Sequence, residues 1–328
     1  MPLSLRRGRV TAVLERHEGL ARLEVDGRPC VAYPRVTGPV ALDDEVIVNV
    51  QARELGLGSG GFDIVYANLT RGLELEPPPG AHVMTLPYTP MQQAVRHAEE
   101  DGQLADHLDG RPAVCCTLHS QLAPVCAGIG EGLRVAYVQV GGGALPVSLS
   151  DAVRALRARG LVGVAVAAAP CIDGDVTCVG VHSALAWAAG AKYDVVVCSV
   201  GPGIVGTGTR LGHGGLAAAG AAAATHELGG RAVLAVRYSE RDPRPRHRGV
   251  SHHTRAVINA CPDSVLVAWP KGVERPEWLA AEEVDVAGWE DACAGLPLDH
   301  MGRGPRDDPA FFAAAFAAGQ LARRLATG

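Results

Sequence analysis

The chain has 328 residues, of which 48% are hydrophobic, and a formal net charge of −5. This length exceeds the usual size of one small domain, so we expect a large domain with a smaller appendage. The negative charge argues against a general nucleic-acid surface, and a nucleic-acid partner is not expected. The longest run of small apolar residues, at 215–225, is too short and too weakly hydrophobic to span a bilayer, so we expect no membrane protein.

The N-terminal and cysteine patterns predict a cytoplasmic protein. The first ten residues, MPLSLRRGRV, carry charge with no apolar segment behind them, so we expect no signal peptide. The nine cysteines form no C-x-x-C pair, and several lie in apolar runs, which is typical of reduced and buried thiols. Lys192 and Lys271 are the only lysines, which leaves few candidates for Schiff-base or P-loop roles.

Residues 1–76 are expected to form a small β domain. Hydrophobic and polar residues alternate there in five short runs: RVTAVLE, LARLEVD, PCVAYPRV, EVIVNV and GFDIVYANL. A period of two is typical of half-buried strands, and five strands with no helix between them predict an antiparallel barrel or sandwich. Three consecutive prolines then predict a stiff linker at 77–80, followed by a second domain over 81–328.

The second domain is predicted to be a doubly wound α/β domain. Six apolar runs without alternation indicate strands buried on both faces, as in parallel sheets: RPAVCCTL, LRVAYVQV, VGVAVAAA, YDVVVCSV, RAVLAVRY and SVLVAW. Helix-like stretches such as 145–160, 175–190 and 308–326 lie between or after them, which favours a mostly parallel, Rossmann-like sheet. The pattern Thr89, Pro90 and Gln92 predicts the start of the first helix. Phe312 and Phe316 are expected to pack in the core, with a homo-oligomer interface as the alternative.

Ligands in such sheets bind at the carboxyl ends of the strands, so the segments that follow the strands are the candidate sites. After the fourth strand, Gly201, Gly203 and Gly206 match G-x-G-x-x-G, and the loop continues through Thr207, Gly208 and Thr209. Bare backbone amides and the helix expected near Gly214 would bind a phosphate or carboxylate. A dinucleotide site is less favoured, because the helix begins outside the motif and Glu240 lies 34 residues beyond Gly206. The alternative is a tight connection that lets the Ala-rich helix pack against the sheet.

The segment 241–255 after the fifth strand combines arginines, histidines and prolines. Arg246 and Arg248 are candidate anion ligands, with His247 beside them, because guanidinium groups bind phosphate or carboxylate through two hydrogen bonds. Ser251 is expected to cap the next helix, which would place His252 and His253 in its first turn and lower their pKa values. A neutral imidazole can act as a general base, an electrophile or a metal ligand. The alternative is a solvated basic loop.

Three further candidates follow the first two strands. His119 is a candidate base, and Ser120 and Gly142 are candidate ligand contacts. The alternatives are a structural histidine and an N-cap serine. We assign no metal site, since no spacing such as H-E-x-x-H is present, although His119, His213, His252 and His253 with Asp173 or Asp175 remain a metal alternative.

The chain resembles a bacterial protein family known only as a domain of unknown function. The resemblance is carried by GPGIVGTGT, DPRPRHRGVSHH, LGLGSGGFDIV and HVMTLPYTPMQ, and it covers nearly the whole chain. It implies membership of that family and no reaction, cofactor or catalytic residue. The chain also lacks the G-x-S-x-G elbow and the G-x-x-x-x-G-K-[ST] loop, which disfavours a hydrolase of the nucleophile-elbow type and a P-loop NTPase.

Three functions remain open from the sequence. The first is an enzyme acting on a small anionic metabolite, with His252, His253 or His119 as acid or base and no cofactor assigned. The second is a non-catalytic module that senses such a ligand, its β domain binding a partner or nucleic acid. The third is an oxidoreductase that uses a nicotinamide cofactor.

Overall fold

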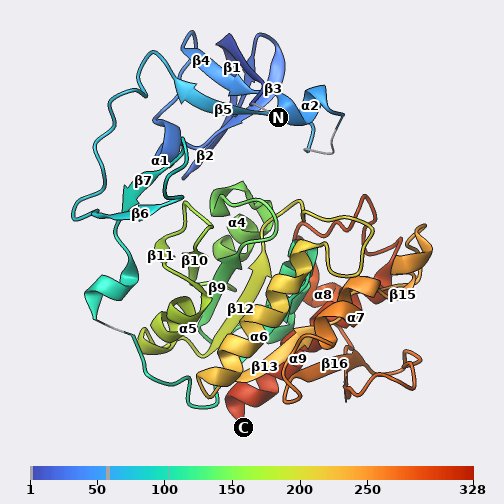
Figure 1. Cartoon of the computed structure of the whole chain (residues 1–328). Helices are drawn as coiled ribbons and strands as arrows, with labels where there is room; N and C mark the ends of the chain where they lie inside the picture. The colour runs from blue at the N-terminus through green and yellow to red at the C-terminus, as the bar shows by residue number, and fades with distance from the viewer. Residues whose placement is uncertain (1–2, 57–59, 103) are drawn as a thin grey trace. The chain divides into compact units, whose positions relative to one another are not determined.

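A computed structural model describes residues 3–56, 60–102 and 104–328. The chain divides into two compact units, Met1–Arg96 and His97–Gly328. The expected linker, residues 77–80, lies within the first unit. Figure 1 shows the course of the chain through both.

The first unit contains a closed five-stranded barrel, as the sequence predicts. Its strands β1 (Leu5–His17), β2 (Leu20–Val25), β3 (Arg28–Ala32), β5 (Asp63–Asn68) and β4 (Glu45–Asn49) pair in that order. The pairs are antiparallel except for β3 and β5, a topology shared with OB-fold barrels. Val46, Val48 and Val50 are all buried, while the residues between them are partly exposed, which is the alternation of a strand with one face inward. The short helices α1 (Pro34–Thr37) and α2 (Gln51–Glu54) join the strands.

The helix expected to begin at Thr89 does not form. The chain there makes a hairpin of β6 (Val83–Thr85) and β7 (Gln93–Val95). The Thr89 hydroxyl donates to the Leu86 carbonyl at 2.8 Å and accepts from the Met91 amide, so it closes a turn instead of capping a helix. Leu86 and Tyr88 both have positive φ, so the turn of the hairpin already begins before Thr89.

The second unit is built on a parallel sheet, and the α/β prediction is confirmed. The six expected strands are β8 (Pro112–Cys116), β9 (Val135–Val140), β10 (Val164–Ala168), β12 (Val195–Val200), β13 (Arg231–Ala235) and β16 (Leu266–Pro270). Two three-residue strands, β11 (Val176–Cys178) and β17 (Glu282–Val284), complete the order β11-β10-β9-β12-β8-β13-β16-β17. β11 occupies part of the expected helix 175–190, which is shorter than predicted.

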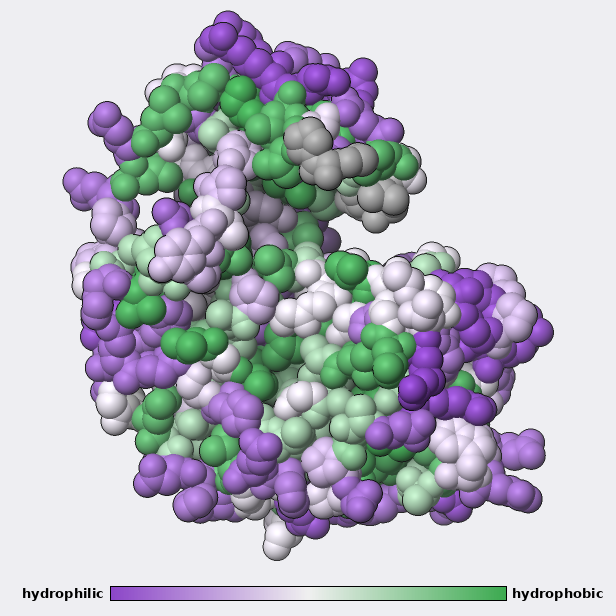
Figure 2. All heavy atoms as spheres, in the orientation of Figure 1, coloured by the Kyte–Doolittle hydropathy of each residue, from purple (hydrophilic) through white to green (hydrophobic). Residues whose placement is uncertain are grey.

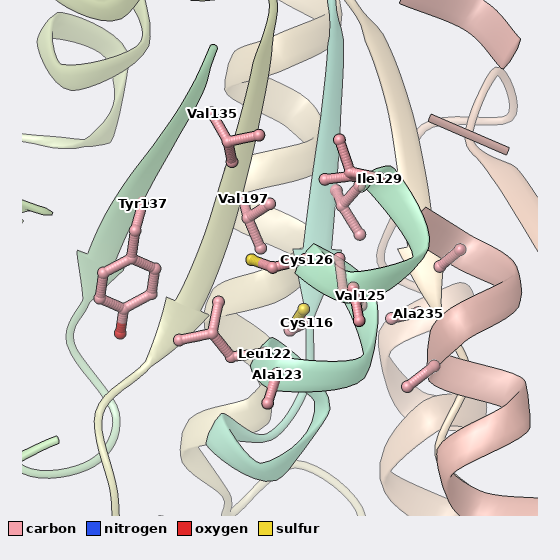
Figure 3. Close-up of a cluster of buried hydrophobic side chains, with 14 of the residues drawn as sticks. Cys116, Leu122, Ala123, Val125, Cys126, Ile129, Val135, Tyr137, Val197 and Ala235 are labelled. Atoms are coloured by element: carbon pink, nitrogen blue, oxygen red, sulfur yellow. The ribbon is translucent and has the colours of Figure 1, made fainter. Parts of the chain in front are cut away.

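Helices cover both faces of the sheet. One face carries α3 (Leu122–Ile129), α4 (Asp151–Ala158), α8 (Trp289–Cys293) and α9 (Pro309–Thr327). The other carries α5 (Val181–Gly190), α6 (Ala217–Glu227) and α7 (His252–Ile258). Neighbouring residues of β8 alternate between the two cores, with Val114 in one and Ala113 in the other. Figure 3 shows α3 packed on the strands through small and branched side chains.

The packing of α9 confirms the predicted role of its phenylalanines. Phe312 and Phe316 are buried in the core. Helices α3 and α9 approach so closely that a Cβ on Gly128 would lie 2.4 Å from the Phe316 carbonyl oxygen. Glycine is therefore required at this crossing. No helix in the described part of the chain is long and apolar enough to cross a membrane.

Short elements shape the segments that follow the strands. They are the 3-10 turns η1 (Ala98–Asp101), η2 (His119–Gln121), η3 (Val147–Leu149), η4 (Gly214–Leu216) and η5 (Pro245–His247), and the hairpin of β14 (Tyr238–Ser239) with β15 (Gly249–Val250). Strand β8 lies between β12 and β13 in the sheet. The segments that leave these three parallel strands therefore start side by side at one edge.

Candidate functional site

The glycine loop after β12 folds back on itself. Gly206 forms a bridge with His213, and the Thr207 amide donates to the Gly212 carbonyl at 2.7 Å. The hydroxyls of Thr207 and Thr209 lie 2.8 Å apart, and each also bonds to the backbone of Gly212. These threonine hydroxyls thus close the loop, and the turn directs His213 back toward the sheet.

Several glycines of this region lie in close contact with the backbone of neighbouring segments. A Cβ on Gly142 would lie 2.6 Å from the Gly214 carbonyl oxygen, and one on Gly201 would lie 2.1 Å from the Ala144 carbonyl oxygen. Close contact between the segments that follow β9 and β12 therefore accounts for Gly142 and Gly201. Gly203 and Gly208 differ, because a Cβ there would meet nothing within 4 Å. Only these open positions leave space for a ligand to approach the backbone.

The segment after β13 is held in place by the β14–β15 hairpin and by the start of α7. Ser251 is the N-cap of α7, as predicted, and its hydroxyl accepts from the His253 amide at 3.2 Å. The same hydroxyl lies 2.8 Å from Nδ1 of His247. One serine thus orients both the helix start and a neighbouring imidazole.

Four imidazoles meet where the two segments converge, and we call them the histidine cluster: His213, His247, His252 and His253. The rings of His213 and His253 stack with centroids 3.8 Å apart. His252 lies 4.3 Å from His253 and 4.8 Å from His247 by the same measure. The loop after β12 and the segment after β13 therefore meet at this cluster, through His213, which the sequence singled out only as a metal alternative.

The imidazoles of the cluster are held neutral. Burial, followed by the charge of Arg237, lowers the pKa of His247 to about 3. Burial, His213 and Arg237 lower the pKa of His253 to about 2. The pKa values of His213 and His252 are lowered too, again first by burial. The sequence attributed this lowering to the helix dipole, whereas burial is its first cause.

A buried network of ion pairs lies next to the histidine cluster. Arg237, Arg244 and Arg303 all bond to the buried carboxylate of Asp242, at 3.3, 2.9 and 3.2 Å. Burial by itself raises the pKa of Asp242, but hydrogen bonds from Arg244 and the nearby guanidinium charges lower it well below its usual value. Arg237 also lies 3.4 Å from Nδ1 of His253, a long contact that links the network to the imidazoles. Arg244 is therefore structural, although it belongs to the basic segment.

Arg246 and Arg248 behave differently from Arg244. Both are exposed, and neither has an ion-pair partner among the described residues. The charge of Arg246 contributes to lowering the pKa of His252, after burial and His213, so this guanidinium lies near the cluster. Figure 2 shows strongly hydrophilic surface in the region where Figure 1 places β15. The side chains of these two arginines are therefore open to solvent.

His119 and Ser120 lie at the same edge but face other partners. Nδ1 of His119 lies 3.1 Å from the Val200 carbonyl oxygen, and Nε2 lies 2.6 Å from the Ser150 hydroxyl. The Ser120 hydroxyl lies 3.3 Å from Nδ1 of His300, whose ring stacks on Phe311. Ser120 belongs to η2 and is not the N-cap of α3, which is Gln121. Within the described residues, the imidazole of His119 therefore bonds to Ser150 and Val200 and not to the histidine cluster.

Some buried polar atoms of this region have no hydrogen-bond partner among the described residues. They include Nδ1 of His213, Nε2 of His252, Nε of Arg237 and Nε2 of His300, while others, such as Oγ1 of Thr85 and Nδ1 of His97, lie elsewhere in the chain. Such atoms carry a desolvation cost when they have no hydrogen bond.

The family assignment rests on a model that matches residues 29–319, the family described as a protein of unknown function, DUF3866. The chain belongs to this family. The resemblance inferred from the sequence motifs is thus confirmed. A comparison with curated proteins found no match.

Sequence reasoning missed four residues of this region: Arg237, Asp242, His300 and Arg303. A signal existed for Arg237, since a charged residue at the end of the apolar run RAVLAVRY must find a buried partner. Asp242 is the only acidic residue between Arg241 and Arg255, which marks it as their internal counter-ion. His300 and Arg303 lie far away in sequence and carry no local signal. The alternative metal site that includes Asp175 does not form, because the Asp175 carboxylate accepts hydrogen bonds from Arg157 and the Ala165 amide.

Proposed function

We propose that the chain is an enzyme that acts on a small anionic metabolite at the carboxyl edge of the larger sheet. The substrate class is phosphorylated, nucleotide-like or carboxylate compounds. One observation carries the proposal: four imidazoles from two crossovers meet near the exposed Arg246. Neutral imidazoles are ready to accept a proton or to ligate a metal at neutral pH.

In this proposal the arginines bind the anion and a histidine meets the substrate. Arg246 and Arg248 attract and orient the anion, since each guanidinium offers paired donors to carboxylate or phosphate oxygens. His252 is partly exposed and carries a buried, unpartnered Nε2, so it is the imidazole best placed to meet a substrate. His253 and His247 are more deeply buried and hold the position of His252. The open backbone at Gly203 and Gly208 lies in the facing loop.

Anion binding is tested by calorimetric titration with inorganic phosphate and pyrophosphate. Replacing Arg246 and Arg248 together with glutamine should weaken binding at least tenfold, because two charge-assisted contacts are lost. Arg231→Gln is the matched control, because Arg231 is equally exposed but begins β13 at the opposite edge of the sheet. Equal weakening by the control variant would reduce the effect to net charge and overturn the assignment.

Turnover is tested on a panel of phosphate esters, nucleotides and acyl compounds. His252→Ala should lower kcat by about 10²-fold or more, while changing the affinity of the chelator-treated protein for pyrophosphate less than about threefold. Binding that persists with no turnover by the wild-type protein on any compound would favour the alternative, a sensing module. A fluorescence titration with NADH and NADPH distinguishes the nicotinamide alternative, and the proposal predicts no saturable signal.

We propose a cytoplasmic location for this activity. All nine cysteines are free thiols, and eight of them are buried, although several lie close together in the strands. Free thiols persist in reducing compartments. Fractionation of cells that express the chain, with detection of the native protein, tests this location.

A further inference from the structure

We propose that His247, His252 and His253 bind one divalent transition-metal ion, of which Zn²⁺ is the reference case. Each of the three side chains offers one ring nitrogen, and the three nitrogens all lie within 4.8 Å of one another. A tetrahedral zinc ion with Zn–N bonds of 2.0–2.1 Å holds its ligand atoms about 3.4 Å apart. Rotations that move each nitrogen by roughly an ångström therefore complete the site.

The donor set selects the class of metal. Three imidazoles suit zinc, copper, nickel and iron, whereas calcium and magnesium require oxygen ligands. The three histidines come from one short stretch with the spacing H-x4-H-H, across η5 and the start of α7. The two elements fix their relative positions before any metal binds, so little ordering cost remains.

Surrounding contacts orient the ligand atoms. Nδ1 of His247 bonds to the Ser251 hydroxyl, which assigns Nε2 of that ring to the metal when Nδ1 carries the proton. The same hydroxyl accepts from the His253 amide. Nε2 of His252 is buried and has no hydrogen-bond partner among the described residues. Metal ligation would satisfy that atom.

His213 is excluded from the ligand set by its ring geometry. Its ring stacks on that of His253 with centroids 3.8 Å apart and planes 16° apart. Nitrogen lone pairs lie in the ring plane, so two parallel stacked rings cannot both direct a lone pair at one tetrahedral ion. Three protein ligands leave one position open, which is the arrangement of catalytic zinc sites.

The neighbouring charges are compatible with a metal that works on an anion. Arg237 opposes a cation at this place, and the carboxylate of Asp242, which also pairs with Arg244 and Arg303, offsets part of that positive charge. The exposed Arg246 then favours a negative group at the open coordination position. The metal inference deepens the proposed function, because it assigns the imidazoles the role of ligands and gives the anion a place beside the ion.

The test is a titration of tag-free, chelator-treated protein with ZnCl₂ and CoCl₂, followed by calorimetry and visible absorption. We expect one ion per chain and the intense bands of four- or five-coordinate cobalt without thiolate charge transfer. His252→Ala should weaken zinc binding at least about 100-fold, and His247→Ala and His253→Ala likewise. His252 is the decisive position, because it is partly exposed and its replacement should leave the fold intact.

Two control variants define the ligand set. His182→Ala removes an exposed histidine of α5 that bonds to Glu227, and zinc affinity should not change. His213→Ala should keep one ion per chain and change the affinity less than about tenfold. The inference is overturned if the wild-type protein binds no zinc at micromolar concentration, or if His252→Ala binds it as tightly as the wild type. Turnover that depends on His252 without metal binding would overturn this inference alone, and metal binding without turnover would overturn only the proposed function.

Discussion

In the barrel, Arg7 of β1 pairs with Glu45 of β4 at 2.6 Å, and their side chains are 66% and 40% exposed. In the larger unit, Arg237 pairs with Asp242 at 3.3 Å, and their side chains are 3% and 0% exposed. Both are pairs of an arginine with a carboxylate, but they differ in their exposure to solvent. A surface pair is screened by water and contributes little, whereas a buried charge cannot lose its partner without a large cost. The two regions show that arginine content does not identify a site until burial is known.

The largest effect is expected when the buried pair is broken. Asp242→Asn keeps the size of the side chain but leaves Arg237, Arg244 and Arg303 without their shared carboxylate. The free energy of unfolding should fall by about 3–5 kcal/mol, because an uncompensated charge remains buried. Denaturant unfolding of the purified variant measures this. A loss below about 1 kcal/mol would mean that the network behaves like the barrel surface.

Backbone packing beside the site gives the next largest effect. Gly142→Ala places a Cβ 2.6 Å from the Gly214 carbonyl oxygen at a φ of 125°, so the contact and the backbone are both strained. We expect a loss of about 2–4 kcal/mol. Gly208→Ala is the matched control, since a Cβ there meets nothing within 4 Å, and its stability should change by less than about 0.5 kcal/mol. Similar losses for both variants would contradict the packing role of Gly142.

The pH dependence of stability tests the burial of His119 in the larger unit. Burial lowers the pKa of His119 from 6.5 to about 4, against the opposing Val200 carbonyl, so the folded state favours the neutral ring. Its contribution is present above pH 6.5 and is lost as the pH falls toward 4, because the unfolded chain binds the proton first. Between pH 7 and 5 the loss should be about 1–2 kcal/mol. His119→Gln should reduce the fall in unfolding free energy over that range, and an unchanged pH profile would contradict the shift.

The smallest effect is expected in the barrel. Glu45→Gln removes the exposed partner of Arg7 and should change the free energy of unfolding little, and far less than Asp242→Asn does. The change should shrink further in high salt, which screens exposed charges. Urea unfolding at low and high salt checks both statements. A loss as large as that of Asp242→Asn would remove the distinction between the regions.

Sequence reasoning succeeded where the cause was local. Continuous apolar runs predicted the six long strands of the parallel sheet, and Ser251 was recognised as a cap because its neighbours in sequence are its partners. The helix predicted to begin at Thr89 was wrong, because a threonine before proline occurs in turns as well as at helix starts. The three-residue strands β11 and β17 were too short to give a pattern.

The candidate site was only partly accessible from the sequence. The contact of His213 with His253 depends on the order of strands, in which β8 separates β12 from β13, and no local pattern encodes that order. His119 looked equivalent to these histidines because it also follows a strand, yet its hydrogen bonds turn it toward Ser150. The role of Asp242 depends on its burial, and the basic sequence around it gives no sign of that burial.

The central claim is that the segments after β12 and β13 form one functional site around the histidine cluster. A crystal structure of the tag-free protein, grown with ZnCl₂ and pyrophosphate and measured at the zinc edge, tests it most directly. We predict an anomalous peak within bonding distance of His247, His252 and His253, with the pyrophosphate beside it and in contact with Arg246 or Arg248. Binding of both elsewhere on the chain, with the four imidazoles unchanged, would contradict the account.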